Sequence, residues 1–315
     1  MTDLQLHGII PATVTPFMPD GALDEQGLRC YLTWLEEQEV HGVTVHADTG
    51  EANTLTPEER VKITGIAAEV LGGKIPVVAC LFAQSTAEAV ELGRRHREAG
   101  ADALMIFPPM AFYGTPLPPE IPEAYYAAIA DEVGLPLVAF QLLSALGGVE
   151  YTPEALRRIL MIDSVVAIKE ATFEALKFRN TMTLVRALPR EISFLSGNDN
   201  FIYESLVLGA DGCLIGFGTL ACREQVEMYE AVQARDFARA ENIAEQLRPL
   251  NEAVFAPPVR NYRARTKEVL AMQGIIEYAG VRRPLPALSP EEVEAVGNGL
   301  SAAGLATEER VKVPE

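Results

Sequence analysis

The chain has 315 residues, and its 26 Lys and Arg against 44 Asp and Glu give a formal net charge of −18. This acidic balance argues against binding to nucleic acid or to an anionic membrane surface, because both need a basic surface. No apolar run approaches the roughly 20 residues of a membrane span. Residues 1–7 lack the basic and apolar segments of a signal peptide, so we expect a cytoplasmic protein.

Short apolar runs rich in β-branched residues alternate with longer segments of helical periodicity along residues 9–222. We expect strands at residues 9–14, 42–46, 76–80, 103–107, 137–141, 165–169, 192–196 and 212–217. Helices are expected between them, at residues 24–38, from 56 onward, 85–99, 119–131, 153–160, 173–187 and 201–208. Eight strands separated by helices predict an α/β fold of the (β/α)₈ TIM barrel type, since an open doubly wound sheet rarely needs eight.

Beyond Cys222 the strand-like runs stop, and the remaining periodicity predicts only helices, at residues 224–234, 237–250, 263–272 and 290–300. We therefore predict a barrel at residues 1–222, a C-terminal helical region at 223–304 and a charged tail at 305–315.

Residue types that bind metals are scattered along the chain. The cysteines show no CxxC spacing and the histidines no HxH or HExxH spacing, so we expect reduced thiols, no metal site and no cofactor. These residues are Cys30, Cys80, Cys213 and Cys222, and His7, His41, His46 and His96.

Lys169 ends the apolar sixth strand, and there its ammonium would lose hydration, which lowers its pKa below the usual value of about 10.4. A neutral lysine amine attacks carbonyl carbons and forms Schiff bases. Alternatively, Lys169 lies just past the strand end and reaches water or pairs with Glu170. The carboxyl ends of barrel strands surround the active site, which favours the catalytic role. Alternation predicts two faces for this strand, one with Val165, Ala167 and Lys169 and the other with Val166, Ile168 and Glu170.

The second predicted strand leads into Ala47-Asp48-Thr49-Gly50-Glu51. A Thr-Gly turn presents backbone N–H groups that can hold a carboxylate. The alternative is an ordinary turn in which Asp48 or Thr49 bonds its own backbone.

Lys169, the segment at residues 49–51 and the opening Gly-Ile-Ile-Pro-Ala-Thr-Val-Thr-Pro-Phe at 8–17 together resemble the dihydrodipicolinate synthase / N-acetylneuraminate lyase superfamily of class I Schiff-base lyases. Further matching segments at 54–60, 195–199, 209–212 and 281–285 extend the resemblance over residues 8–300. The resemblance implies that Lys169 attacks the ketone of pyruvate or another 2-keto acid. It also implies a homodimer or homotetramer, and substrate contacts at Thr49, Gly50, Phe140 and Gly216.

The sequence departs from the family pattern at its acid–base residues. Asp48 replaces the first threonine of Gly-Thr-Thr-Gly-Glu, and Phe140 replaces the relay tyrosine of Tyr-Asn-x-Pro. The paired tyrosines after strand four align with residues 110–111, although Tyr113 is nearby, and the arginine that holds the aldehyde substrate aligns with Ala145. Because phenylalanine cannot transfer a proton, we expect Asp48, desolvated beside a hydrophobic mouth, to do the acid–base work. Tyr113, a bound water and the substrate carboxylate are alternatives.

Three functions remain open. The first is a lyase acting on a 2-keto acid through a lysine Schiff base, either an aldolase or a 2-keto-3-deoxy sugar acid dehydratase. The second is dihydrodipicolinate synthase, condensing pyruvate with aspartate semialdehyde, against which the missing tyrosine and arginine argue. The third is a catalytically silent barrel that binds a 2-keto acid.

Two further patterns have ordinary structural interpretations. The segment Gly216-Phe217-Gly218-Thr219 follows strand eight, where barrels often bind phosphate. We prefer the interpretation that its glycines let the substrate approach the barrel wall. The basic run Arg260, Arg263, Arg265 and Lys267 is typical of a solvated face or of salt bridges between subunits.

Overall fold

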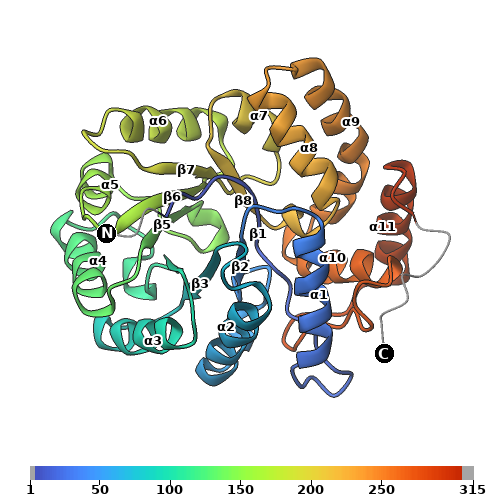
Figure 1. The fold of residues 1–315 in the computed structure, drawn as a ribbon, viewed down its shortest axis with the longest axis horizontal. Helices are drawn as coiled ribbons and strands as arrows, with labels where there is room; N and C mark the ends of the chain where they lie inside the picture. Colours follow the sequence, from blue (N-terminus) through green and yellow to red (C-terminus); the bar gives the residue numbers. More distant parts are fainter. Residues whose placement is uncertain (1–3, 307–315) are drawn as a thin grey trace.

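The computed structural model describes residues 4–306 and shows a barrel of parallel strands surrounded by helices (Figure 1). The sheet has eight strands in the order β1-β8-β7-β6-β5-β4-β3-β2. An isolated parallel bridge from Ala12 to Thr44 joins the two ends of the sheet and nearly closes the ring. The strands are β1 (Gly8–Pro11), β2 (Val43–Val45), β3 (Val77–Leu81), β4 (Ala103–Ile106), β5 (Leu137–Leu142), β6 (Val165–Ala171), β7 (Ser193–Ser196) and β8 (Gly212–Ile215).

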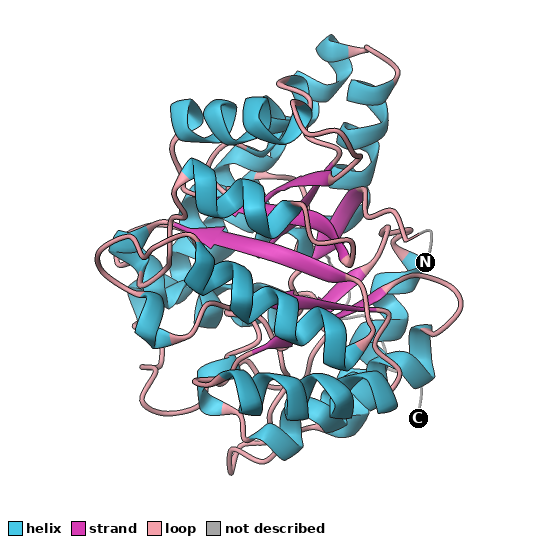
Figure 2. Ribbon diagram, turned by 90° about the vertical axis from the view of Figure 1, so that its left-hand side faces the viewer, coloured by secondary structure: helices cyan, strands magenta, loops and turns pink. Residues whose placement is uncertain are grey.

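One helix follows each strand, and these helices form the outer layer around the strands (Figure 2). They are α1 (Glu25–Glu37), α2 (Pro57–Leu71), α3 (Thr86–Glu98), α4 (Glu120–Val133), α5 (Pro153–Leu160), α6 (Ala175–Arg186), α7 (Ile202–Val207) and α8 (Cys222–Gln233). Short 3₁₀ turns lie in the loops: η1 (Ala52–Thr54), η2 (Met110–Phe112), η3 (Ser144–Leu146), η4 (Phe217–Thr219) and η5 (Val259–Asn261). The predicted TIM barrel is confirmed.

Three more helices follow the barrel: α9 (Phe237–Val254), α10 (Tyr262–Met272) and α11 (Pro290–Ala302). They lie beside α8 and α1, on the side where the first and last strands meet (Figure 1). The division at residue 222 stays a prediction. α8 begins at that residue and packs against β1. Most of the predicted tail, residues 307–315, lies outside the described part of the chain, as do residues 1–3.

Local sequence signals explain where helices begin. Thr56 caps α2 through a capping box with Glu59, and Pro57 occupies the first helical position. The predicted helix at 237–250 in fact continues to Val254 although Pro249 lies inside it. Leu250 and Val254 are both buried, and this burial offsets the hydrogen bond that proline removes. No helix within residues 4–306 is both long and apolar enough to cross a membrane.

Two apolar cores stabilise the barrel. The outer core fills the space between the strands and the helices, and the inner core fills the barrel itself. Members of the inner core include Ile10, Val78, Met105, Val138, Ala167 and Leu214. The barrel is therefore packed, and the open space for a substrate is at its carboxyl end.

The predicted alternation along β6 is wrong at its first two residues. Val138 pairs with Ala167 whereas Leu137 pairs with Val165, so Val166 is an extra residue at an irregularity in the register. Val165 packs in the outer core and Val166 against the inner core. A bulge of this kind reverses the faces of the residues before it, whereas Lys169 keeps the predicted inward face.

Candidate active site

Lys169 lies inside the barrel near the carboxyl end of β6, between the inner-core residues Ala167 and Ala171. It is only 8% exposed, and its Nζ is 4.9 Å from the ring centroid of Phe140. Burial lowers the pKa of Lys169, and the negative charge of Asp199 is the largest opposing influence. The strand end is not open to water here, so the alternative of a lysine that reaches solvent is wrong.

Glu170 points away from Lys169 and fixes the neighbouring strand end. Its carboxylate accepts hydrogen bonds from Asn198 Nδ2 at 2.9 Å and from the Thr172 amide at 3.3 Å. Its carbonyl accepts from the Gly197 amide at 2.6 Å. A Cβ atom at Gly197 would lie 2.7 Å from Lys169 Cε. Glycine at this position therefore leaves the space that the Lys169 side chain needs.

Asp199 is a site residue that the sequence analysis did not single out. It is 8% exposed and accepts a hydrogen bond from the Phe217 amide at 2.7 Å. Burial raises its pKa to about 6, while the amide bonds and Lys169 act in the opposite direction. The sequence could have indicated this residue through its position shortly after β7, on the mouth side of the barrel.

The segment after β8 does not favour phosphate. The amide of Phe217 already donates to Asp199, and this carboxylate would repel a second anion. A Cβ atom at Gly216 would lie 3.1 Å from Thr49 Oγ1. The preferred interpretation, in which glycine keeps the barrel wall open to the substrate, stays a prediction.

Asp48 faces the C-terminal helical region. Its carboxylate forms an ion pair with Arg263 and accepts a hydrogen bond from Tyr262 Oη at 3.2 Å. Arg263 Nε also donates to the Asp48 carbonyl at 2.8 Å. The Asp48 side chain is 45% exposed, so the hydrophobic setting expected for it is wrong. Both partners come from the first turn of α10, which excludes the alternative of a purely local turn.

Thr49 and Gly50 follow Asp48 in the turn after β2. Thr49 is 3% exposed, and its Oγ1 is 3.2 Å from Tyr262 Oη. The Gly50 carbonyl accepts from Thr15 Oγ1 at 2.8 Å, and a Cβ atom on Gly50 would lie 2.9 Å from the Thr13 carbonyl oxygen. Among residues 4–306 we find no hydrogen-bond acceptor for the amides of Thr49 and Gly50. That these amides hold a carboxylate stays a prediction.

The prediction that the basic run in the C-terminal region is solvated is wrong for three of its four members. Arg265 and Lys267 are 2% and 0% exposed, and the Arg263 side chain is 15% exposed. Arg265 pairs with Glu292 at 2.6 Å, and Lys267 pairs with Glu51. Through Arg263 and Lys267, α10 reaches the turn after β2, whereas Arg265 joins α10 to α11.

Aromatic side chains line another part of the mouth. Phe140 is 3% exposed, and its ring centroid lies 4.7 Å from that of Phe107, which stacks on Phe82. Tyr113 is 46% exposed. Partial burial and the charge of Asp48 raise its pKa, which places Tyr113 within electrostatic range of Asp48.

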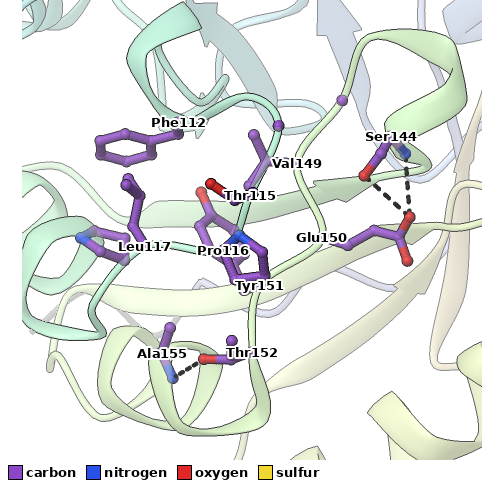
Figure 3. A pocket seen from close by; sticks show the side chains of 13 residues that line it. Phe112, Thr115, Pro116, Leu117, Ser144, Val149, Glu150, Tyr151, Thr152 and Ala155 are labelled. Atoms are coloured by element: carbon purple, nitrogen blue, oxygen red, sulfur yellow. Dashed lines mark hydrogen bonds between the residues drawn. The ribbon is translucent and has the colours of Figure 1, made fainter.

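A shallow cavity lies between the loops that follow β4 and β5 (Figure 3). Thr115, Pro116 and Tyr151 line it, and Glu150 at its edge accepts hydrogen bonds from the amide and hydroxyl of Ser144. None of the predicted site residues lines this cavity. Within the described chain, no group of three or more His, Cys, Asp or Glu is arranged to hold a metal ion.

Comparison with known proteins gives one consistent result. Residues 5–303 match the model of the dihydrodipicolinate synthetase family. A 4-hydroxy-tetrahydrodipicolinate synthase of Archaeoglobus fulgidus is 32% identical over 300 residues, covering 95% of this chain and 99% of the relative. Another from Methanothrix thermoacetophila is 34% identical over 249 residues, covering 79% of this chain and 82% of the relative.

Solved structures agree with this result. The dihydrodipicolinate synthase of Aquifex aeolicus superposes with a TM-score of 0.85 at 26% identity, covering 96% of this chain and 100% of that one. The chloride-inhibited enzyme of Acinetobacter baumannii in complex with pyruvate gives a TM-score of 0.83 at 29% identity, with 96% and 100% covered.

Proposed function

Because the chain belongs to the dihydrodipicolinate synthetase family, whose members are class I lyases, we propose that Lys169 forms a Schiff base with a 2-keto acid. The proposed reaction is aldol cleavage that releases pyruvate, or dehydration of a 2-keto-3-deoxy sugar acid. The observation that carries the proposal is the desolvated amine of Lys169 at the carboxyl end of a barrel strand. Burial increases the neutral, nucleophilic fraction of this amine.

The surrounding groups have complementary proposed roles. The free amides of Thr49 and Gly50 hold the carboxylate of the keto acid. Gly216 leaves room for the substrate chain beside Thr49, and Phe140 covers the amine. Once the imine has formed, it draws electrons from C3, so that a C3 proton or the bond between C3 and C4 is weakened.

Asp48 remains our proposed acid–base group. Its carboxylate lies at the mouth, half exposed, and Arg263 holds it in place. Replacing Asp48 with Asn keeps the size of the side chain but removes the carboxylate that would accept a proton. The variant should lose turnover and keep imine formation. Turnover at the wild-type rate would exclude Asp48 from acid–base work.

Borohydride reduction tests the proposal directly. The protein is incubated with pyruvate, and separately with a panel of 2-keto-3-deoxy sugar acids, reduced, digested and mapped by mass spectrometry. A keto acid attached to Lys169 is the expected product, and the Lys169→Met variant is the control that should carry none. A folded protein without any adduct would instead support the catalytically silent barrel.

Dihydrodipicolinate synthase activity is the alternative that the names of the relatives favour. This reaction needs a cation for the carboxylate of the aldehyde substrate. Ala145, at the position of the family arginine, is exposed in η3, and Arg263 of α10 is paired with Asp48. Condensation assays with pyruvate and aspartate semialdehyde separate the two reactions. The cytoplasmic location and the homodimer or homotetramer stay predictions.

A further inference from the structure

Tyr262 places a phenol hydroxyl in the mouth of the barrel, although it comes from the C-terminal region. Its Oη lies 3.2 Å from Asp48 Oδ2 and 3.2 Å from Thr49 Oγ1. Its ring stacks on Phe255, with 5.2 Å between the ring centroids, and the Arg263 guanidinium lies 4.9 Å from the same ring. These contacts hold the hydroxyl in one place between two residues of the turn after β2.

The hydrogen-bond directions at Tyr262 follow from proton counting. An ionised carboxylate only accepts, so the single phenol proton goes to Asp48. Thr49 must then donate its hydroxyl proton to the phenol oxygen. Burial and the charge of Asp48 raise the pKa of Tyr262, which keeps the phenol protonated at neutral pH. The result is a directed chain from Thr49 through Tyr262 to Asp48.

Tyr262 also borders the space above Gly216, where we place the substrate chain in the proposed function. A Cβ atom at Gly216 would lie 3.3 Å from the Tyr262 ring, 3.1 Å from Thr49 Oγ1 and 3.7 Å from Asp199 Oδ1. Asp199 is in turn the charge that acts most strongly on Lys169. The ring edge of Tyr262 therefore borders the same small space above Gly216 as Thr49 and Asp199, the carboxylate whose charge acts on the Schiff-base lysine.

We infer that Tyr262 is a catalytic residue that carries protons between the imine-bound keto acid and Asp48. This inference rests on the proposed function. With pyruvate, a C3–H bond of the protonated imine breaks, its electron pair forms the C2–C3 double bond, and the C–N π pair moves to the nitrogen, which gives a neutral enamine. The proton passes to Tyr262 Oη as the phenol proton passes to Asp48 Oδ2. Asp48 is half exposed and exchanges this proton with water.

Deuterium exchange into pyruvate tests the inference without knowledge of the natural substrate. Wild-type protein and the Tyr262→Phe, Tyr113→Phe and Asp48→Asn variants are incubated with pyruvate in D₂O. Proton NMR then follows loss of the C3 methyl signal as a function of pyruvate concentration. Borohydride trapping of pyruvate on Lys169 is measured in parallel for each protein. Tyr113 is the matched control, because it also lies near Asp48 but forms no hydrogen bond with it in the described structure.

The Tyr262→Phe variant should still be trapped by borohydride, since phenylalanine preserves the ring stacking. Its maximal exchange rate should fall about 10²- to 10⁴-fold, the usual contribution of acid–base catalysis, with an unchanged half-saturating pyruvate concentration. Asp48→Asn should show a loss of the same kind, and Tyr113→Phe should exchange like the wild type.

Other outcomes are distinguishable. Exchange at the wild-type rate in Tyr262→Phe, or a loss confined to Tyr113→Phe, would overturn the inference and leave the Schiff base intact. Trapping without exchange in the wild type would also count against it. If the wild-type protein neither traps pyruvate on reduction nor exchanges its C3 protons, the proposed function itself is overturned.

Discussion

Replacing Glu51 with Gln is expected to destabilise the whole protein, because this carboxylate neutralises a buried lysine. The side chains of Glu51 and Lys267 are both 0% exposed and form an ion pair. Glu51 also accepts the Arg282 amide at 2.8 Å, and Lys267 donates to the Gly280 carbonyl at 2.9 Å. The pair ties the turn at residues 48–51 to α10 and to the segment at 280–282.

The expected loss can be sized from this burial. Removing one partner of a buried ion pair costs about 3–5 kcal/mol, since the other charge is left uncompensated. With an unfolding entropy of about 2.1 cal/mol/K per residue, a chain of 315 residues should melt about 5–8 °C lower. The matched control is Glu69→Gln, which breaks the exposed pair with Arg29 and should leave the melting temperature nearly unchanged, because solvent screens an exposed pair.

The destabilisation should also depend on pH. Burial lowers the pKa of Lys267 from 10.5 to about 8, and Glu51 opposes this shift. Without Glu51 the pKa of Lys267 in the folded protein falls further. Just below pH 8 the unfolded variant therefore binds more protons than the folded variant, so raising the pH stabilises the folded variant. The stability of the wild type rises with pH in this way only above about pH 8. The difference in the free energy of unfolding between wild type and variant should therefore shrink between pH 7 and 8, by up to about 1.4 kcal/mol per pH unit, and the difference in melting temperature should shrink with it.

Thermal unfolding followed by circular dichroism measures these differences at each pH. Equal losses for Glu51→Gln and Glu69→Gln would refute the argument from burial. A gap that widens from pH 7 to 8 would refute the assignment of the uncompensated charge to Lys267.

Two predictions concern Lys169 itself. Gly197→Ala should abolish borohydride trapping of pyruvate in a folded protein, because the added Cβ would lie 2.7 Å from Lys169 Cε. Its control is Gly65→Ala in α2, where a Cβ meets nothing within 4 Å, and equal trapping in both variants would contradict the steric argument. Asp199→Asn removes the charge that most raises the pKa of Lys169, so the amine is neutral at lower pH. In the pH profile of the rate of trapping by cyanoborohydride, the acid limb should move to lower pH. A limb that stays in place or moves to higher pH would exclude the electrostatic coupling between Asp199 and Lys169.

Much of the fold follows from local sequence patterns. Each strand is a short apolar run and each helix a segment of 3.6-residue periodicity with its own caps, as Thr56 shows for α2. Because these signals act over a few residues, the sequence alone determined the order of the elements and hence the barrel. It also placed Lys169 at a strand end, where the topology of a barrel assigns it to the mouth.

The partners of the site residues were decided only by the tertiary structure. Tyr262 and Arg263 reach Asp48 across more than 200 positions of the chain, and Lys267 reaches Glu51 in the same way. In the sequence, Arg263 and Lys267 belong to an ordinary charged run on a helix. A charge pattern does not reveal which face of that helix packs against the rest of the protein. The bulge at Val166 was equally hidden, because it depends on the register with β5. Periodicity is a local property, whereas burial and pairing are set by whichever distant segment packs alongside.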